Sequence, residues 1–134
     1  HLRKGDDYMQ SELMGKGLCT VDYYMKAIDY MRKHINNPHF YVFTDNPCWV
    51  KDNLPEFEYM LVDWNEVSGK RNFRDMQLMS CAKHNIIGNS TYSWWAAWLN
   101  ANQDKIVVGP KRFFNPINSF FSTCDIMCED WISL

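Results

Sequence analysis

Residues 75–100, DMQLMSCAKHNIIGNSTYSWWAAWLN, decide the expected fold. Their apolar pattern predicts, in order, a helix over residues 73–84, a short buried strand over 85–87 and a second helix over 94–100. A small polar turn at residues 88–91, GNST, leads from the strand towards the second helix. Because the first N–H groups of a helix have no partners within it, this turn is a candidate anion site.

The rest of the chain alternates between helical and strand patterns. It predicts a helix over 21–36, a strand over 40–43, a short helix over 47–53, and strands over 59–62 and 105–109. Thr20 and Asn72 are the expected caps of the two longer helices, with Asp75 completing a box-like arrangement. Residues 111–134 give no clear prediction. Strands that alternate with helices indicate an α/β fold with a mainly parallel, Rossmann-like sheet.

Ligands bind such sheets at the carboxyl ends of the strands. Asp45, the 88–91 turn and the opening HLRKGD (residues 1–6) fall at such ends, provided that a strand precedes His1. Loss of that strand would leave an open sheet edge. We therefore expect residues 1–134 to be one piece of a larger protein.

Composition fits a single folded domain. The 134 residues are 46% hydrophobic and 16% aromatic, which is typical of a globular chain with one core. The formal net charge of −2 argues against bulk binding of nucleic acid or of an anionic membrane surface. No apolar run has the length that spans a bilayer.

Five irregularly spaced cysteines, Cys124 among them, favour neither a disulfide scaffold nor a zinc site. We expect buried, reduced thiols of a cytosolic protein. The chain begins with His and not Met, so any targeting or anchoring segment is expected to have been lost with the natural start. The expected location is the cytoplasm, free or at the inner face of a membrane.

Arg3 is the first candidate for binding an anion, because a guanidinium grips two phosphate oxygens at once. Lys4 adds a point charge, and Gly5 permits close approach of the backbone. The simpler interpretation is a solvated basic terminus with a surface pair between Arg3 and Asp6. From these residues alone, the simpler interpretation is favoured.

Ser90 and Thr91 carry hydroxyl groups that can donate to an anion, although ordinary helix capping explains them equally well. Asp75 is able to accept from the two N–H donors of a guanine edge, but a carboxylate that complements the helix dipole is the commoner role. Trp95 and Trp98 are expected in the core. No P-loop, Asp-x-Asp pair or nucleophile elbow occurs.

Several blocks, taken as a set over residues 1–115, resemble the α-1,2-fucosyltransferases of glycosyltransferase family eleven. HLRKGD at residues 1–6 looks like the family's H-x-R-R-G-D motif. Other blocks that resemble the family follow in order and spacing: CTVDYY (19–24), FTD (43–45), Trp49, DMQLMS (75–80), NSTYSWW (89–95), AWLN (97–100) and PKRF (110–113).

The resemblance implies a two-lobed GT-B fold in which this chain is the C-terminal, donor-binding lobe. The family's N-terminal lobe, with its Gly-Gly-x-Gly-Asn-Gln type loop, is absent from the sequence. Lys4 stands where the family usually has a second Arg, so a bidentate contact becomes a point contact there. Gly88 and Tyr92 are mild departures.

The activity that the resemblance implies is inverting transfer of L-fucose from GDP-fucose to a galactoside hydroxyl. Arg3 and Asp6 are the expected catalytic residues, Arg3 for the leaving diphosphate and Asp6 as a candidate general base or a structural partner of Arg3. The residues expected to bind the donor are His1, Arg3, Lys4, Asp75, Asn89, Ser90 and Thr91. No metal cofactor is expected. The expected partners are GDP-fucose, a galactose-containing acceptor glycan and the missing N-terminal lobe, and the isolated piece is expected to be inactive.

Three alternatives stay open. One is a fucosyltransferase of another linkage or acceptor, and another is a non-catalytic nucleotide-binding module. A plain structural α/β domain is the third, and it predicts no binding of GDP.

Overall fold

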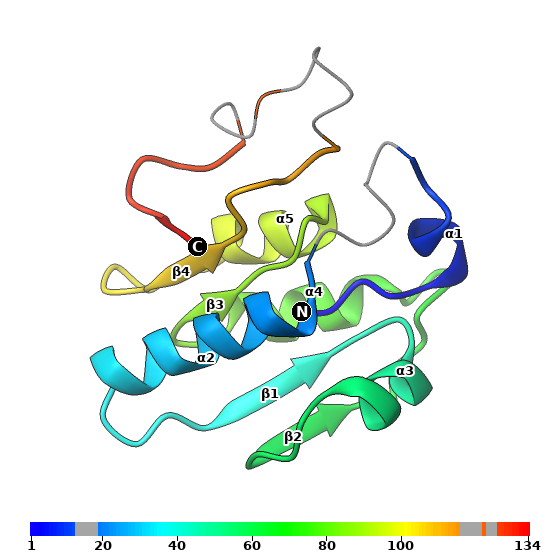
Figure 1. Cartoon of the computed structure of the whole chain (residues 1–134), viewed down its shortest axis with the longest axis horizontal. Coiled ribbons are helices and arrows are strands. Elements are labelled where there is room, and N and C mark those ends of the chain that lie inside the picture. Colours follow the sequence, from blue (N-terminus) through cyan, green and yellow to red (C-terminus); the bar gives the residue numbers. More distant parts are fainter. Residues whose placement is uncertain (13–18, 116–121, 123–125) are drawn as a thin grey trace.

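The computed structural model describes residues 1–12, 19–115, 122 and 126–134. Helices and short strands alternate along the chain (Figure 1). They are α1 (Asp6–Met9), α2 (Val21–His34), β1 (Phe40–Phe43), α3 (Pro47–Asn53), β2 (Tyr59–Val62), α4 (Phe73–Ser80), β3 (Asn85–Ile86), α5 (Thr91–Leu99), β4 (Val107–Gly109) and β5 (Ile132–Ser133).

The strands form two short parallel sheets, β1-β2 and β3-β4-β5. Leu2 makes a parallel bridge with Thr44, and its N–H donates to the carbonyl of Phe43 at 2.8 Å. The amino group of His1 donates to the carbonyl of Ile86 at 2.9 Å. The first two residues therefore lie between β1 and β3 and join the sheets. This confirms the predicted α/β class with parallel pairing, which is compatible with a Rossmann-like fold.

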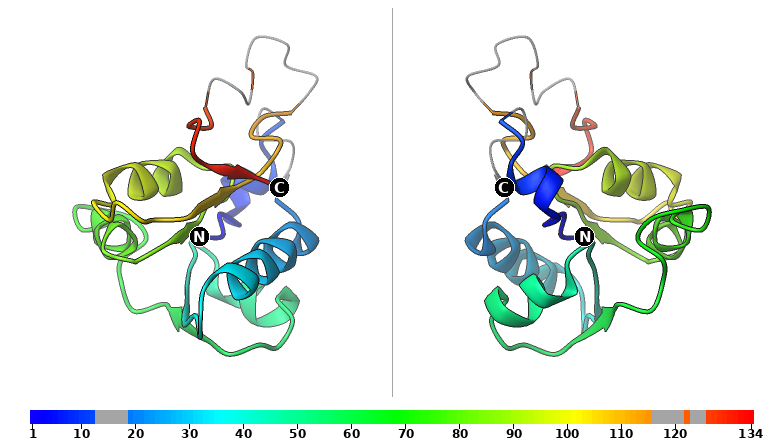
Figure 2. Two further views of the ribbon diagram at one scale, coloured as in Figure 1. Left: turned by 90° about the vertical axis from the view of Figure 1, so that its left-hand side faces the viewer. Right: turned by 90° about the vertical axis from the view of Figure 1, so that its right-hand side faces the viewer.

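Helices cover both faces of the sheets (Figures 1 and 2). Helices α2 and α3 lie on one face, and α4 and α5 lie on the other. Since successive strand side chains point to opposite faces, neighbouring residues of β1 belong to different cores. Val42 packs in a cluster with Tyr24 of α2 and Val50 of α3, whereas Phe43 packs in a cluster with Ala96 of α5.

The predicted helix boundaries were partly right. The Thr20 hydroxyl accepts the N–H of Tyr23 at 3.3 Å, which confirms the predicted cap of α2. The helix ends at His34 and not at residue 36, because Ile35 is already extended. Strand β5 lies within residues 111–134, a region for which the sequence analysis made no prediction.

The segment that decides the fold differs from its prediction in detail. Helix α4 ends at Ser80, four residues early, and α5 begins at Thr91, three residues early. The capping box is absent because Asn72 has helical backbone angles and its side chain caps nothing. Instead, the hydroxyl of Tyr92 donates to the carbonyl of Asn72 and accepts the N–H of Met76 at 2.9 Å.

Several side chains lie closer to solvent than predicted. Cys19 is buried, but Cys48 and Cys81 are exposed, so the expectation of buried thiols fails for these two. Cys124 lies outside the described residues. Trp95 and Trp98 are about half exposed on α5, because Ser93, Ala96 and Ala97 are the buried residues of that helix. In the part of the chain that the structure describes, no helix is long and apolar enough to cross a membrane.

Candidate functional site

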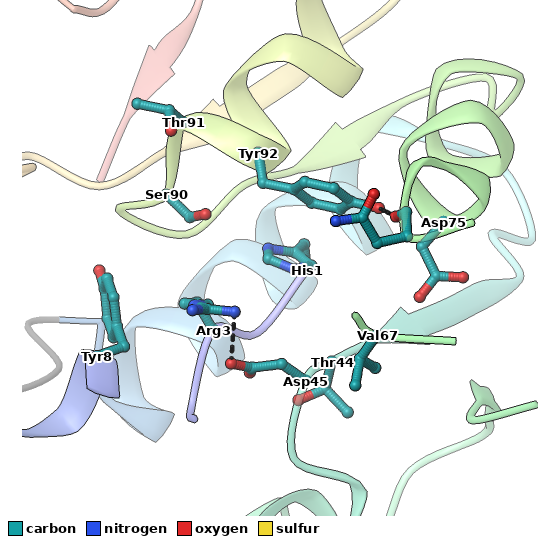
Figure 3. Close-up of a pocket in the computed structure, with 11 residues that line it drawn as sticks. His1, Arg3, Tyr8, Thr44, Asp45, Val67, Asp75, Ser90, Thr91 and Tyr92 are labelled. Carbon is teal, nitrogen blue, oxygen red and sulfur yellow. Dashed lines mark hydrogen bonds and ion pairs between the residues drawn. The ribbon is translucent and has the colours of Figure 1, made fainter. Parts of the chain in front are cut away.

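A polar pocket of about 350 Å³ opens at the carboxyl ends of β1 and β3 (Figure 3). Its walls come from the opening segment, from the end of β1, from the start of α4 and from the turn that leads into α5. Five of the residues predicted for donor binding line it, namely His1, Arg3, Asp75, Ser90 and Thr91. These residues are far apart in the sequence, and the parallel sheet brings them together.

Arg3 is held by two carboxylates. Its Nη1 lies 2.8 Å from Oδ2 of Asp45, and its Nη2 lies 2.7 Å from Oδ2 of Asp7. The sequence suggested a surface pair between Arg3 and Asp6, but the ion pairs of Arg3 among the described residues are with Asp7 and Asp45. Asp6 begins α1, and the residue four positions after Arg3 is Asp7, which the first helical turn brings beneath the guanidinium.

Asp45 also fixes the backbone that carries Arg3. Its Oδ1 accepts the N–H of Lys4 at 2.6 Å, and its Oδ2 accepts the N–H of Gly5 at 2.8 Å. A Cβ atom at residue 5 would overlap Oδ2 of Asp45, so glycine is required for this close approach. One carboxylate at the end of β1 therefore orders the whole stretch from Arg3 to Gly5.

The opposite wall of the pocket is the predicted 88–91 turn. Ser90 occupies the N-cap position of α5, but its hydroxyl makes no capping bond. Capping therefore does not explain this hydroxyl, which lines the pocket. The first N–H groups of α5 follow at Thr91 and Tyr92, where a helix carries partial positive charge.

Asn89 supports the turn from behind and does not line the pocket. It is 1% exposed, and its Nδ2 donates to the carbonyl of Phe113 at 3.3 Å. Its N–H donates to the sulfur of Cys19 at 3.3 Å, and its carbonyl accepts the hydroxyl of Tyr8. The structure thus gives Asn89 a structural position, in contrast to the predicted contact with the ligand.

Asp75 lies at the far side of the pocket, beyond His1 from Arg3 (Figure 3). Its Oδ1 accepts from Nδ2 of Asn65 at 2.7 Å. Burial raises the pKa of the Asp75 carboxyl above its ordinary value, and the bond from Asn65 opposes this shift. Asp75 also stands in the first turn of α4, so its charge complements that helix dipole as well.

His1 lies between the two ends of the pocket. Its ring contacts the ring of Tyr92, with 5.5 Å between the centroids. Its Nδ1 is the buried side-chain atom that has no hydrogen-bond partner among the described residues. A buried nitrogen without a partner is costly.

Lys4 and Asp6 are not brought to the pocket. The Lys4 side chain is 3% exposed, its Nζ donates to the carbonyl of Cys19 at 2.7 Å, and it lies 4.6 Å from the ring centre of Trp49. Burial lowers the pKa of this amine. The structure thus places the amine in the core, outside the pocket in which a contact with a phosphate was predicted. Asp6 is exposed in the first turn of α1, outside the pocket lining.

The sequence analysis missed several lining residues, including Tyr8, Thr44, Val67 and Tyr92. Thr44 lies directly after β1, so the rule that ligands bind at strand ends could have found it. No comparable signal marks Val67, which belongs to a loop. Within the described ranges, no group of three His, Cys, Asp or Glu side chains could hold a metal ion. The pocket thus offers a guanidinium and a helix N-terminus at one end and a carboxylate at the other.

Comparison with known proteins gives the family. The sequence model described as "Glycosyl transferase family 11" matches residues 1–134, and the chain belongs to this family. Over its whole length the chain is 39% identical to the O-antigen biosynthesis glycosyltransferase WbnK of Escherichia coli and 36% identical to an alpha-1,2-colitosyltransferase of Escherichia coli. Over 74% of its length it is 25% identical to galactoside alpha-(1,2)-fucosyltransferase 1 of Homo sapiens.

The chain spans less than half the length of these relatives, namely 43% and 46% of the two bacterial proteins and 27% of the human one. No solved structure matches the chain.

Proposed function

We propose that the pocket binds the GDP part of GDP-fucose and that the complete protein transfers L-fucose, with inversion, to a galactoside hydroxyl in α-1,2 linkage. Membership of glycosyl transferase family 11 supports the reaction class, since this family implies a nucleotide-sugar donor and a glycan acceptor. The relatives named as α-1,2-fucosyltransferases support the sugar and the linkage. In this proposal, the chain is the donor-binding lobe of a GT-B enzyme, and a further lobe contributes to choice of the acceptor.

The observation that carries the proposal is the position of Arg3 opposite the N-terminus of α5 across one pocket (Figure 3). A diphosphate between them would accept from the guanidinium on one side and from Ser90, Thr91 and the first N–H groups of α5 on the other. The proposal includes no metal ion. The guanidinium and the helix N-terminus supply the attraction for negative charge, and the two carboxylates on Arg3 oppose it.

The guanine base would lie towards Asp75. Its N1 and N2 atoms are both donors, and a carboxylate is a matching pair of acceptors. The Nδ1 atom of His1, buried and without a partner among the described residues, lies between the two ends. We assign the His1 side chain to the ribose or the base, because this residue lines the pocket between the two ends.

Catalysis would follow from stabilising the leaving diphosphate. As the glycosidic bond breaks in an oxocarbenium-like transition state, negative charge grows on the phosphate oxygens next to Arg3. A preorganised contact of this kind is typically worth ~3 kcal/mol of barrier. A role of Asp6 as general base stays a prediction, and so does a location in the cytoplasm or at the inner face of a membrane.

A second candidate is transfer of colitose in place of fucose. The alpha-1,2-colitosyltransferase of Escherichia coli is 36% identical over the whole chain, so it is closer than the human fucosyltransferase at 25%. Both candidates place a diphosphate against Arg3 and differ in the sugar. A third, non-catalytic candidate keeps nucleotide binding alone.

Calorimetry of the chain with GDP, combined with a transfer assay of the full-length protein, tests the proposal. We expect GDP to bind the chain and Arg3→Ala to weaken it by about a hundredfold, since charge-assisted contacts are the strong ones. Full-length protein should transfer radiolabel from GDP-fucose to lactose, and Arg3→Ala should abolish most of this transfer without loss of folding. Absence of GDP binding, or unchanged kinetics of Arg3→Ala, would contradict the proposal. Binding of GDP without transfer from GDP-fucose would leave the colitose and the non-catalytic candidates, and transfer from GDP-colitose would separate these two.

A further inference from the structure

We propose that the two carboxylates on Arg3 act in opposite directions on the binding of a diphosphate. In this inference, Asp45 is a positioning residue that holds the guanidinium towards the pocket. Asp7 is a competitor that occupies the guanidinium until the ligand displaces it. The inference rests on the proposed function, because it assumes that the pocket takes a diphosphate.

Asp45 is built into the fold. Its side chain is 11% exposed, and both of its oxygens are used, by the N–H groups of Lys4 and Gly5 as well as by Nη1 of Arg3. It directly follows Thr44, whose bridge to Leu2 ties β1 to the opening segment. A carboxylate with three donors on two oxygens cannot leave without disordering the backbone that carries Arg3.

Asp7 has none of these ties. Its side chain is 73% exposed, and among the described residues its one side-chain partner is Nη2 of Arg3, at 2.7 Å. It belongs to α1, a helix of four residues. Exposed ion pairs of this kind contribute little to stability and are screened by salt. Asp7 can therefore rotate into solvent when an anion with more charge arrives at the guanidinium.

Charge alone does not predict this division. Both carboxylates lie next to the guanidinium that would bind the phosphates, so a Coulomb argument predicts that neutralising either one tightens binding. Geometry predicts otherwise at Asp45. An Asn side chain there has a single acceptor oxygen, so its NH₂ group faces either the N–H of Lys4 or the N–H donors of Gly5 and Arg3. Facing donors repel each other in either orientation, so the guanidinium or the backbone that carries it would lose its position.

The experiment measures the affinity of the chain for GDP, guanosine and inorganic pyrophosphate in Asp45→Asn and Asp7→Asn variants by calorimetry. Asp45→Asn should lower the affinity for GDP and for pyrophosphate at least about tenfold and leave the affinity for guanosine unchanged, because only the phosphates contact Arg3 in this proposal. At low ionic strength Asp7→Asn should tighten both phosphate ligands about two- to fivefold, and 0.5 M NaCl should abolish this gain. The control is Asp63→Asn, which removes another exposed partner of a cation, 3.3 Å from Lys51, and should change nothing.

Three results would overturn the inference. Tighter binding in both variants would show that charge alone decides. Equal losses for GDP and guanosine in Asp45→Asn would show a merely structural role. Weaker binding in Asp7→Asn would exclude competition, and this arm holds even if Asp45→Asn does not fold. If the wild type binds pyrophosphate but not GDP, and Asp45→Asn weakens the binding of pyrophosphate while Asp7→Asn tightens it, the proposed function fails and the inference stands. If the wild type binds neither ligand, both fail.

Discussion

Lys4→Met should lower the stability of the fold and leave binding of GDP almost intact. The amine of Lys4 points away from the pocket, donates to the carbonyl of Cys19 at 2.7 Å and lies over the ring of Trp49. Met has a similar length and fills the same space without a charge. The substitution therefore separates a structural role of this side chain from a role in binding phosphate.

The size of the loss follows from these two contacts. A hydrogen bond from a charged group contributes about 1.5–3 kcal/mol, and a buried cation–π contact adds up to about 2 kcal/mol. Against this, the cost of keeping an ammonium group in the core disappears with the amine. The lowered pKa of Lys4 means that this cost outweighs the attraction of the charge, so the main loss is the buried donor to the carbonyl of Cys19. We expect a net loss of about 2 kcal/mol in the free energy of unfolding, measured by urea titration.

The pH dependence gives an independent check. The pKa of Lys4 is lowered in the folded chain from an ordinary value of 10.5, because burial disfavours the charged form. The unfolded chain then binds more protons than the folded chain at pH values between the lowered pKa and 10.5. The wild type should therefore gain stability as the pH rises through that interval, whereas Lys4→Met should lack this gain.

Lys51→Met is the matched control. Lys51 is an exposed lysine whose Nζ lies 3.3 Å from a carboxylate oxygen of Asp63, so its replacement should change stability by less than about 1 kcal/mol. Affinity for GDP should change by less than about fivefold in both variants, since neither amine faces the pocket. Unchanged stability of Lys4→Met together with a large loss of GDP affinity would refute the reasoning and restore Lys4 as a phosphate ligand.

Three further predictions concern the pocket. Gly5→Ala places a Cβ atom against Oδ2 of Asp45, so the affinity for pyrophosphate, measured by calorimetry, should fall about tenfold or more. An affinity equal to that of the wild type would contradict the need for this close approach. Asp75→Asn should reduce the preference for GDP over ADP about tenfold, whereas equal losses for both nucleotides would indicate a helix-end role alone. Gly88→Ala places a Cβ atom 2.7 Å from the buried hydroxyl of Tyr24, so thermal unfolding should occur several degrees lower, and an unchanged midpoint would show that this contact relaxes freely.

The position of the site was predictable because the sheet is parallel. Strand patterns ending at Phe43 and at residue 87 place the following polar residues at one edge, and the pocket lies there. Asp45 was placed at this edge, but its hold on Arg3 was not foreseen. The contact joins residues 42 positions apart, and no local pattern encodes which of several carboxylates meets a given guanidinium.

The direction of the Lys4 side chain has a simpler origin. HLRKGD reads as a basic cluster, but burial alternates along its first four residues, as in an extended chain, whose alternate side chains point in opposite directions. Leu2 and Lys4 are buried, whereas His1 and Arg3 line the pocket. Leu2 was the available signal, because an apolar side chain at position 2 predicts that position 4 shares its direction.

The boundaries of α4 and α5 were less predictable, since they depend on contacts between the two helices. The hydroxyl of Tyr92 binds the backbone at Asn72 and Met76, so the first turn of α5 is tied to the first turn of α4. Apolar periodicity does not report such a contact. The exposure of Trp95 and Trp98 was also not predictable from periodicity. The small residues Ser93, Ala96 and Ala97 take the buried positions of α5 and leave these two side chains outside.

Lys4 links the two walls of the pocket through Cys19. Lys4 donates to the carbonyl of Cys19, and the sulfur of Cys19 accepts the N–H of Asn89 in the turn on the other wall. Burial raises the pKa of the Cys19 thiol to about 11, so the sulfur stays neutral in this path. The segment that carries Arg3 and the turn that carries Ser90 are therefore braced through one buried residue. In the proposed function a diphosphate touches both walls at once, so this brace would preorganise the site before the ligand arrives.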